Sequence, residues 1–152
     1  MEQPRPSTPQ GSTASPPQRS GLGHPIALCL HEVPGEDPHF DLFLAPSEPF
    51  DDQDRVLRSW RLPCSPLALQ PGESVAVVPI GTHRGCYARL QAPMQPSNGQ
   101  GVVTPVLSGD ASCSDSAQGV SSLDVVWDDG SQTSLTLSPA TEDNPAQLTR
   151  IA

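Results

Sequence analysis

The chain has 152 residues, of which 35% are hydrophobic and 4% aromatic, so we expect one domain with a modest core. Its formal net charge is −9, and it contains eight arginines and no lysine. It therefore lacks the basic stripe of proteins that grip many phosphates along a nucleic acid. Because no apolar run is long enough for a signal peptide or a membrane span, we expect a cytoplasmic protein without membrane contacts.

The N-terminal residues 1–23 are rich in Pro and Ser and show no apolar period. Such a composition is typical of a disordered arm, because it offers too little apolar surface to offset the entropy of folding. We expect the folded domain at 24–139 and a loose C-terminal tail at 140–152.

Short β-type segments separated by Pro, Gly and Asp fill the domain, and no stretch of a dozen residues holds a helical period free of proline. Their spacing predicts an all-β fold, a small closed or partly closed barrel of about eight short strands. Pro105 cannot donate to a strand ladder and indicates an edge or a bulge. The expected strands are 25–31, 38–45, 56–62, 74–80, 85–90, 101–107, 122–127 and 133–138.

The second of these segments contains an H-x-D pair. Because side chains alternate along a strand, His39 and Asp41 share one face with Phe43. An imidazole and a carboxylate so placed can converge on one divalent ion, and a third ligand from another strand would leave positions open for water and substrate. His31 and His83 are the candidates for that third ligand. The alternative is that the pair belongs to the wetted face of an amphipathic strand.

Two kinds of enzyme fit the same residues. In the first, His39, Asp41 and His83 form the two-histidine, one-carboxylate triad of a small non-haem iron oxygenase. Arg89 would then be the cation nearest to a cosubstrate carboxylate.

The second kind is indicated by four motifs, "HFDLFL", "LRSWRLP", "THRGCYARL" and "SNGQGVVTPVLSG". In order and approximate spacing they resemble the 3′-phosphoesterase domain of bacterial DNA ligase D and its small stand-alone relatives. That family has a His, an H-Y-D or H-W-D triplet, an S-W or T-W element, a D-H-x-x-x-Y motif and a G-x-G strand along one side of a small β-barrel. The resemblance covers roughly residues 25–110.

The resemblance implies that His31, His39 and Asp41 bind a divalent ion, with Mn²⁺ preferred and Zn²⁺ or Fe²⁺ as alternatives. It also implies that His83 and Tyr87 are catalytic residues that contact phosphate. The reaction would remove a 3′-ribonucleoside or 3′-phosphate from a DNA end during repair, and the expected partners are the DNA 3′ end or primer-template and other repair proteins. Such chemistry needs an ion that polarises a phosphate oxygen and donors that stabilise the developing charge.

Arginines supply the remaining candidate phosphate contacts, which we expect at Arg58, Arg84 and Arg89. Arg58 and Arg61 fall on opposite faces of one strand, so at most one of them meets phosphate from that strand.

Three positions that carry charge in the family are uncharged here: Phe43, Cys64 and Gly81. Each such charge contributes to binding phosphate or to orienting a partner. The sequence therefore leaves a second possibility, a catalytically weakened module that retains its metal and binds a partner or a nucleic-acid end.

Overall fold

The structure is a computed structural model that describes residues 23–96 and 101–152. These residues fold into a small β-barrel. The described residues form nine strands and two short 3₁₀ helices, η1 and η2, and no helix among them is long and apolar enough to cross a membrane. The expected arm lies almost wholly outside these residues. The elements are β1 (His24–Glu32), β2 (His39–Leu44), β3 (Arg55–Leu62), η1 (Pro66–Ala68), β4 (Ser74–Ala76), β5 (Val78–Arg84), η2 (Gly85–Arg89), β6 (Val102–Asp115), β7 (Ser121–Trp127), β8 (Gln132–Ser138) and β9 (Gln147–Arg150).

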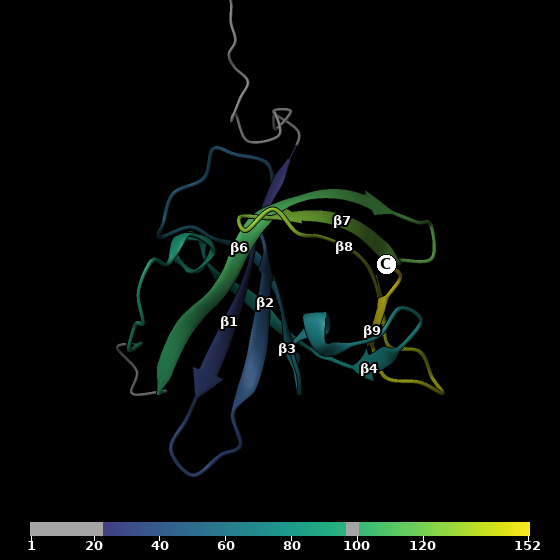
Figure 1. Ribbon diagram of the computed structural model, residues 1–152, viewed down its shortest axis with the longest axis horizontal. Coiled ribbons are helices and arrows are strands. Elements are labelled where there is room, and N and C mark those ends of the chain that lie inside the picture. The colour runs from purple at the N-terminus through teal and green to yellow at the C-terminus, as the bar shows by residue number, and fades with distance from the viewer. Residues whose placement is uncertain (1–22, 97–100) are drawn as a thin grey trace, which may run out of the picture.

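All neighbouring strands pair antiparallel, in the order β4-β9-β8-β7-β6-β1-β2-β3-β5. The two outermost strands, β4 and β5, are consecutive in the chain and are separated only by Val77, whose N–H donates to the carbonyl of Ala146. One bent segment thus pairs with β9 at its start and with β3 at its end. This bend brings the two edges of the sheet together and gives the nearly closed barrel that the sequence predicts (Figure 1).

The barrel interior holds the larger apolar core. Leu123 of β7 and Leu135 of β8 face each other in the register and are each 1% exposed. Trp60 joins this core at 8% exposure. Burial of such side chains is the main favourable term in folding.

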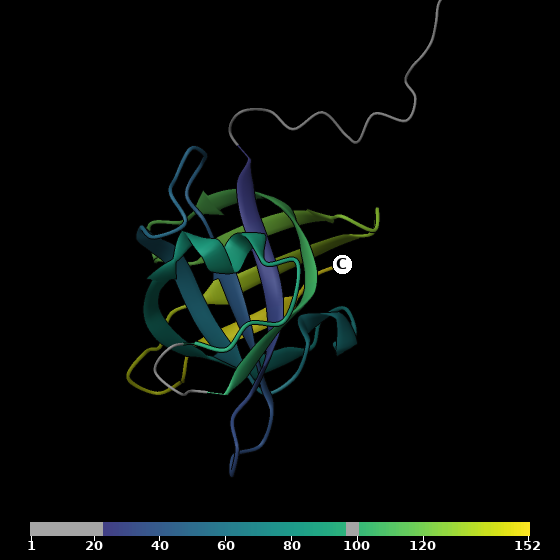
Figure 2. The same cartoon turned by 90° about the vertical axis from the view of Figure 1, so that its left-hand side faces the viewer.

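The outer face of β1, β2 and β3 is also covered. The 3₁₀ helix η2 contacts all three strands and lies over them (Figure 2). A second apolar cluster fills the space, with Cys29, Phe43 and Leu57 from the strands and Tyr87 and Ala88 from η2. This part of the sheet is therefore buried on both sides.

The expected strand at 85–90 is wrong, because these residues form η2. The N–H groups of Gly85 and Cys86 donate to the carbonyls of Asp54 and Asp52, respectively, in the loop before β3. The backbone of Gly85 and Cys86 therefore bonds to that loop and does not continue the sheet beyond β5.

The C-terminal residues differ from the expected loose tail. Residues 147–150 form β9, which pairs with both β8 and β4. Leu148 is 0% exposed and belongs to the barrel core. A four-residue strand near the chain end shows too little pattern for sequence reasoning, and its pairing depends on β4.

Two other boundaries also differ from expectation. The single strand expected at 74–80 is divided at Val77 into β4 and β5, and the strand expected at 101–107 continues to Asp115. The bulge expected at Pro105 is confirmed, since the β1–β6 register shifts there and leaves Val106 without an opposite residue.

Candidate metal centre

Three polar side chains meet on the covered outer face. His31 of β1 lies opposite His39 of β2, and Asp41 follows on the same face of β2. His39 Nε2 is 3.0 Å from His31 Nδ1, His31 Nδ1 is 3.2 Å from Asp41 Oδ2, and His39 Nε2 is 3.5 Å from Asp41 Oδ1. All three residues are buried. The face shared by His39, Asp41 and Phe43 is thus confirmed, but it is not a wetted face.

These separations suit one metal ion. Donor atoms bound at about 2.1 Å to the same ion lie about 3.0–3.5 Å apart when they are neighbours in a tetrahedral or octahedral arrangement. Asp41 Oδ1 is buried without a hydrogen-bond partner, and an unmet buried acceptor costs about 1–3 kcal/mol. Two imidazoles and a carboxylate are suitable ligands for Mn²⁺, Zn²⁺ or Fe²⁺.

Protonation favours the same conclusion. Burial lowers the pKa of His39 below its ordinary value, so its ring is neutral near pH 7, as a metal ligand requires. Cys29 lies opposite Asp41 on β1. Burial, and next the charge of Asp41, raises the pKa of this thiol to about 12. The thiol therefore stays protonated in the metal-free protein.

The segment between His31 and His39 forms a loop whose turn is closed by the Glu36 N–H donating to the Val33 carbonyl at 3.0 Å. This loop joins β1 to β2 so that His31 lies directly opposite His39.

His83 lies at the end of β5 on the same outer face. Ser59 Oγ donates to the Leu57 carbonyl, so it accepts the hydrogen bond from His83 Nδ1 at 2.9 Å. Burial lowers the pKa of His83, and the neutral ring then has Nε2 as its unprotonated nitrogen. Phe43 and Tyr87 stack on each other, and both pack edge-on against the His83 ring.

His83 is not one of the gathered ligands, since the group with donor atoms within 4.8 Å of one another consists of His31, His39 and Asp41. The ligand set expected for an iron oxygenase, with His83 as the distal histidine, is therefore not the set that the structure brings together.

Arg61 is the residue that sequence reasoning missed. It lies on β3 directly opposite Asp41, with Arg61 Nε 3.7 Å from Asp41 Oδ1. The alternation of side chains along the strand predicts that Arg58 and Arg61 lie on opposite faces. It does not tell which of the two arginines shares the face of Asp41, because that depends on the β2–β3 register, in which Asp41 pairs with Arg61.

The three arginines expected at phosphate have other partners. Arg58 lies on the opposite face of β3, where it donates to Ser121 Oγ and lies 3.9 Å from Asp115. Arg89 donates to Asp52 and Glu48.

Arg84, the third of these arginines, donates to Gln53 Oε1 and lies 5.9 Å from the Tyr87 ring. Arg84 is therefore tied to the loop before β3 and lies near Tyr87.

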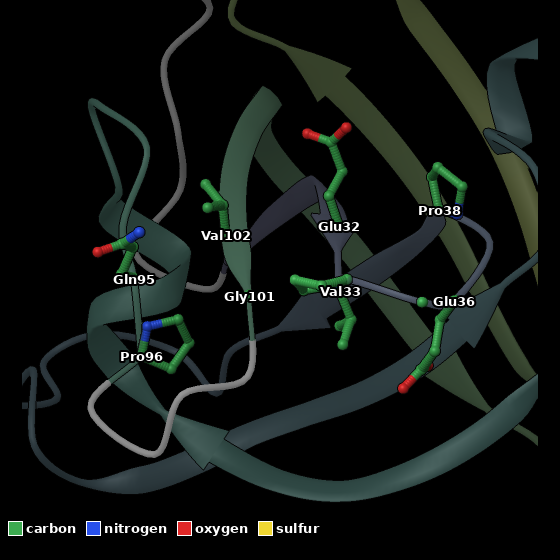
Figure 3. A pocket seen from close by; sticks show the side chains of 10 residues that line it. Glu32, Val33, Glu36, Pro38, Gln95, Pro96, Gly101 and Val102 are labelled. Carbon is green, nitrogen blue, oxygen red and sulfur yellow. The ribbon is translucent and has the colours of Figure 1, made fainter.

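An open groove of about 730 Å³ lies at the end of the β1–β2 hairpin. Gln95 and Pro96 line one side, and Glu36 and Pro38 line the other (Figure 3). Its charged lining residues among those described are acidic, so it does not suit a phosphate chain.

Comparison with known proteins adds no assignment. No family model matches this chain, and no curated protein has a significantly similar sequence.

Proposed function

We propose that this protein is a divalent-metal-dependent phosphoesterase that removes a 3′-phosphate or 3′-ribonucleoside from DNA ends. The observation that carries the proposal is the convergence of His31, His39 and Asp41 donor atoms within 4.8 Å of one another. It is supported by His83 and Arg61 on the same face, and by the resemblance of the four motifs to the ligase D 3′-phosphoesterase.

Each residue has a distinct role in this proposal. His31, His39 and Asp41 would hold the ion, which would polarise a phosphate oxygen and activate a water molecule. Ser59 fixes the tautomer of His83 through Nδ1, so that Nε2 can accept a proton from the attacking water. Phe43 and Tyr87 both pack edge-on against the His83 ring and hold it in place.

The charge of the chain restricts how DNA binds. With a formal net charge of −9, the overall field repels a nucleic acid, so contacts must be local to the terminal phosphate. We therefore propose an enzyme of cytoplasmic DNA repair that engages the 3′ end itself and not a long stretch of duplex.

A metal-retaining module with weakened catalysis is the second candidate. It is favoured by the partners of Arg58, Arg84 and Arg89, which are bound elsewhere in the fold. Such a module would bind a DNA end or a partner protein without turnover.

The test is 3′-end processing of a primer-template that carries a 3′-phosphate or a 3′-ribonucleotide, in the presence of Mn²⁺. Wild type should process it. His83→Ala should abolish turnover and change Mn²⁺ affinity by less than about threefold, since His83 is outside the ligand group. Metal binding without turnover in wild type would favour the second candidate. Retained turnover in His83→Ala would refute the proposed role of His83.

A further inference from the structure

No hydrogen bond or short ion pair within the described part of the fold explains the position of the Arg61 guanidinium. Its Nε is buried and makes no hydrogen bond, and the nearest ion pair, to Asp41 Oδ1, is 3.7 Å long. The side chain as a whole is 42% exposed. One edge of the group therefore faces the buried donor cluster while the rest reaches solvent.

The other described arginines are used differently. Each donates at least one hydrogen bond that ties parts of the fold together. These arginines are Arg55, Arg58, Arg84, Arg89 and Arg150. Among the described arginines, Arg61 alone donates none. Its position is therefore not explained by a role in holding the fold.

Neutralising Asp41 is the simplest alternative role for Arg61. An arginine that served this role would be expected to donate to the carboxylate, because charge-assisted pairs are short, at about 2.7–2.9 Å. Asp41 Oδ1 and Arg61 Nε instead both lack hydrogen bonds. An ion bound to Asp41 and an oxyanion bound to that ion would satisfy both atoms.

We propose that Arg61 binds the phosphate group of the substrate beside the ion held by His31, His39 and Asp41. This inference rests on the proposed function and adds to it the residue that recognises the anion. The planar guanidinium fork matches a phosphate in a way that an ammonium does not. Because an imidazole binds a metal ion in its neutral form, a divalent ion together with Arg61 would outweigh the single charge of Asp41, and the net positive charge would favour a terminal phosphate.

The experiment measures inorganic phosphate binding to the Mn²⁺-loaded full chain by calorimetry. It compares wild type with Arg61→Met and Arg61→Lys, after separate Mn²⁺ titrations of each protein. Arg58→Met is the matched control, because Arg58 lies on the same strand with a similarly exposed side chain, 48% against 42%, but on the opposite face. Thermal melting checks that each variant is folded.

We expect Arg61→Met to weaken phosphate binding at least about tenfold and to leave Mn²⁺ affinity unchanged or higher, since a nearby positive charge is removed. Arg61→Lys should fall between wild type and Arg61→Met, because it keeps the charge and loses the fork. Arg58→Met should match wild type.

The outcomes separate the two proposals. Equal phosphate affinity in wild type and Arg61→Met, with Mn²⁺ bound in both, would overturn the role of Arg61 and leave the metal site intact. If Arg61→Met does not fold, an Arg61→Lys protein with unchanged phosphate affinity would overturn it equally. Absence of Mn²⁺ binding in wild type would overturn the proposed function, and the Arg61 inference with it.

Discussion

The two halves of the barrel differ in what covers their outer face. In β7 and β8, buried and more exposed residues alternate, and the outward side chains include Ser122 and Asp124. In β1 and β2, buried residues follow one another without alternation. The same antiparallel sheet therefore has one half whose outer face meets water and one half whose outer face is covered by η2, with the barrel core on the inner side of both.

This difference explains where chemistry is feasible. On the half that meets water, polar side chains can be hydrated, so a buried partner is not required. Asp124 is an example, since its hydrogen bond from Ser134 is exposed to solvent. On the enclosed half, His39 and Asp41 have lost most of their water. Buried polar groups are costly unless they are paired or bind an ion. The cover supplied by η2 thus turns an ordinary strand face into a candidate site.

The largest expected effect concerns the barrel core beneath the wet half. Leu123→Ala should lower the free energy of unfolding by about 2–5 kcal/mol, because Leu123 is fully buried and its truncation leaves a cavity. Urea unfolding measures this loss. Ser122→Ala, one residue away on the exposed face, should change stability by less than about 0.5 kcal/mol. Loss of Mn²⁺ binding in folded Leu123→Ala would contradict the separation of the two halves.

A smaller effect is expected at the cover. A Cβ at Gly85 would lie 2.5 Å from the Asp51 carbonyl oxygen and 2.6 Å from the Phe50 ring. Gly85→Ala should therefore destabilise the protein by about 1–3 kcal/mol through overpacking. Hydrogen exchange should show lost protection concentrated in η2 and the loop before β3. Equal loss of protection in β7 and β8 would contradict an independent cover.

The smallest effect is on pH dependence. The pKa values of His39 and His83 are lowered in the folded protein by burial, so below about pH 6.5 the unfolded chain binds more protons than the folded one. Their contribution to stability is present above that pH and is lost as pH falls through the folded pKa values. Metal-free protein should be less stable to urea at about pH 5.5 than at about pH 7.5.

A double variant, His39→Gln with His83→Gln, isolates the contribution of these two histidines. Its stability should decline less between the same two pH values, because the two side chains whose pKa values are lowered by burial are no longer present. An identical decline in wild type and the double variant would contradict the assignment of the effect to the enclosed half.

Local patterns predicted much of this molecule. The alternating direction of side chains along the segment around His39 gives the correct face for His39, Asp41 and Phe43, and the strand expected at 122–127 corresponds to β7. The convergence of His31 with His39 also follows from simple hairpin pairing of two adjacent strands. These features depend on residues close in sequence, where periodicity carries most of the information.

The remaining features depend on long-range partners. Arg61 meets Asp41 only through the β2–β3 register, which the loop between those strands does not reveal. The helix η2 depends on hydrogen bonds from Gly85 and Cys86 to a distant loop. Strand β9 depends on pairing with β4, far away in the chain. No periodicity within these short segments could have predicted such contacts.

The most direct test of the metal centre is calorimetric titration of the full chain with Mn²⁺. Wild type should bind about one ion, and Asp41→Asn should weaken the affinity at least about tenfold, because it removes the only carboxylate of the ligand group. Asp124→Asn, a matched change on the wet half, should bind as wild type does. No binding heat in wild type, or equal affinity in Asp41→Asn, would contradict a metal site at His31, His39 and Asp41.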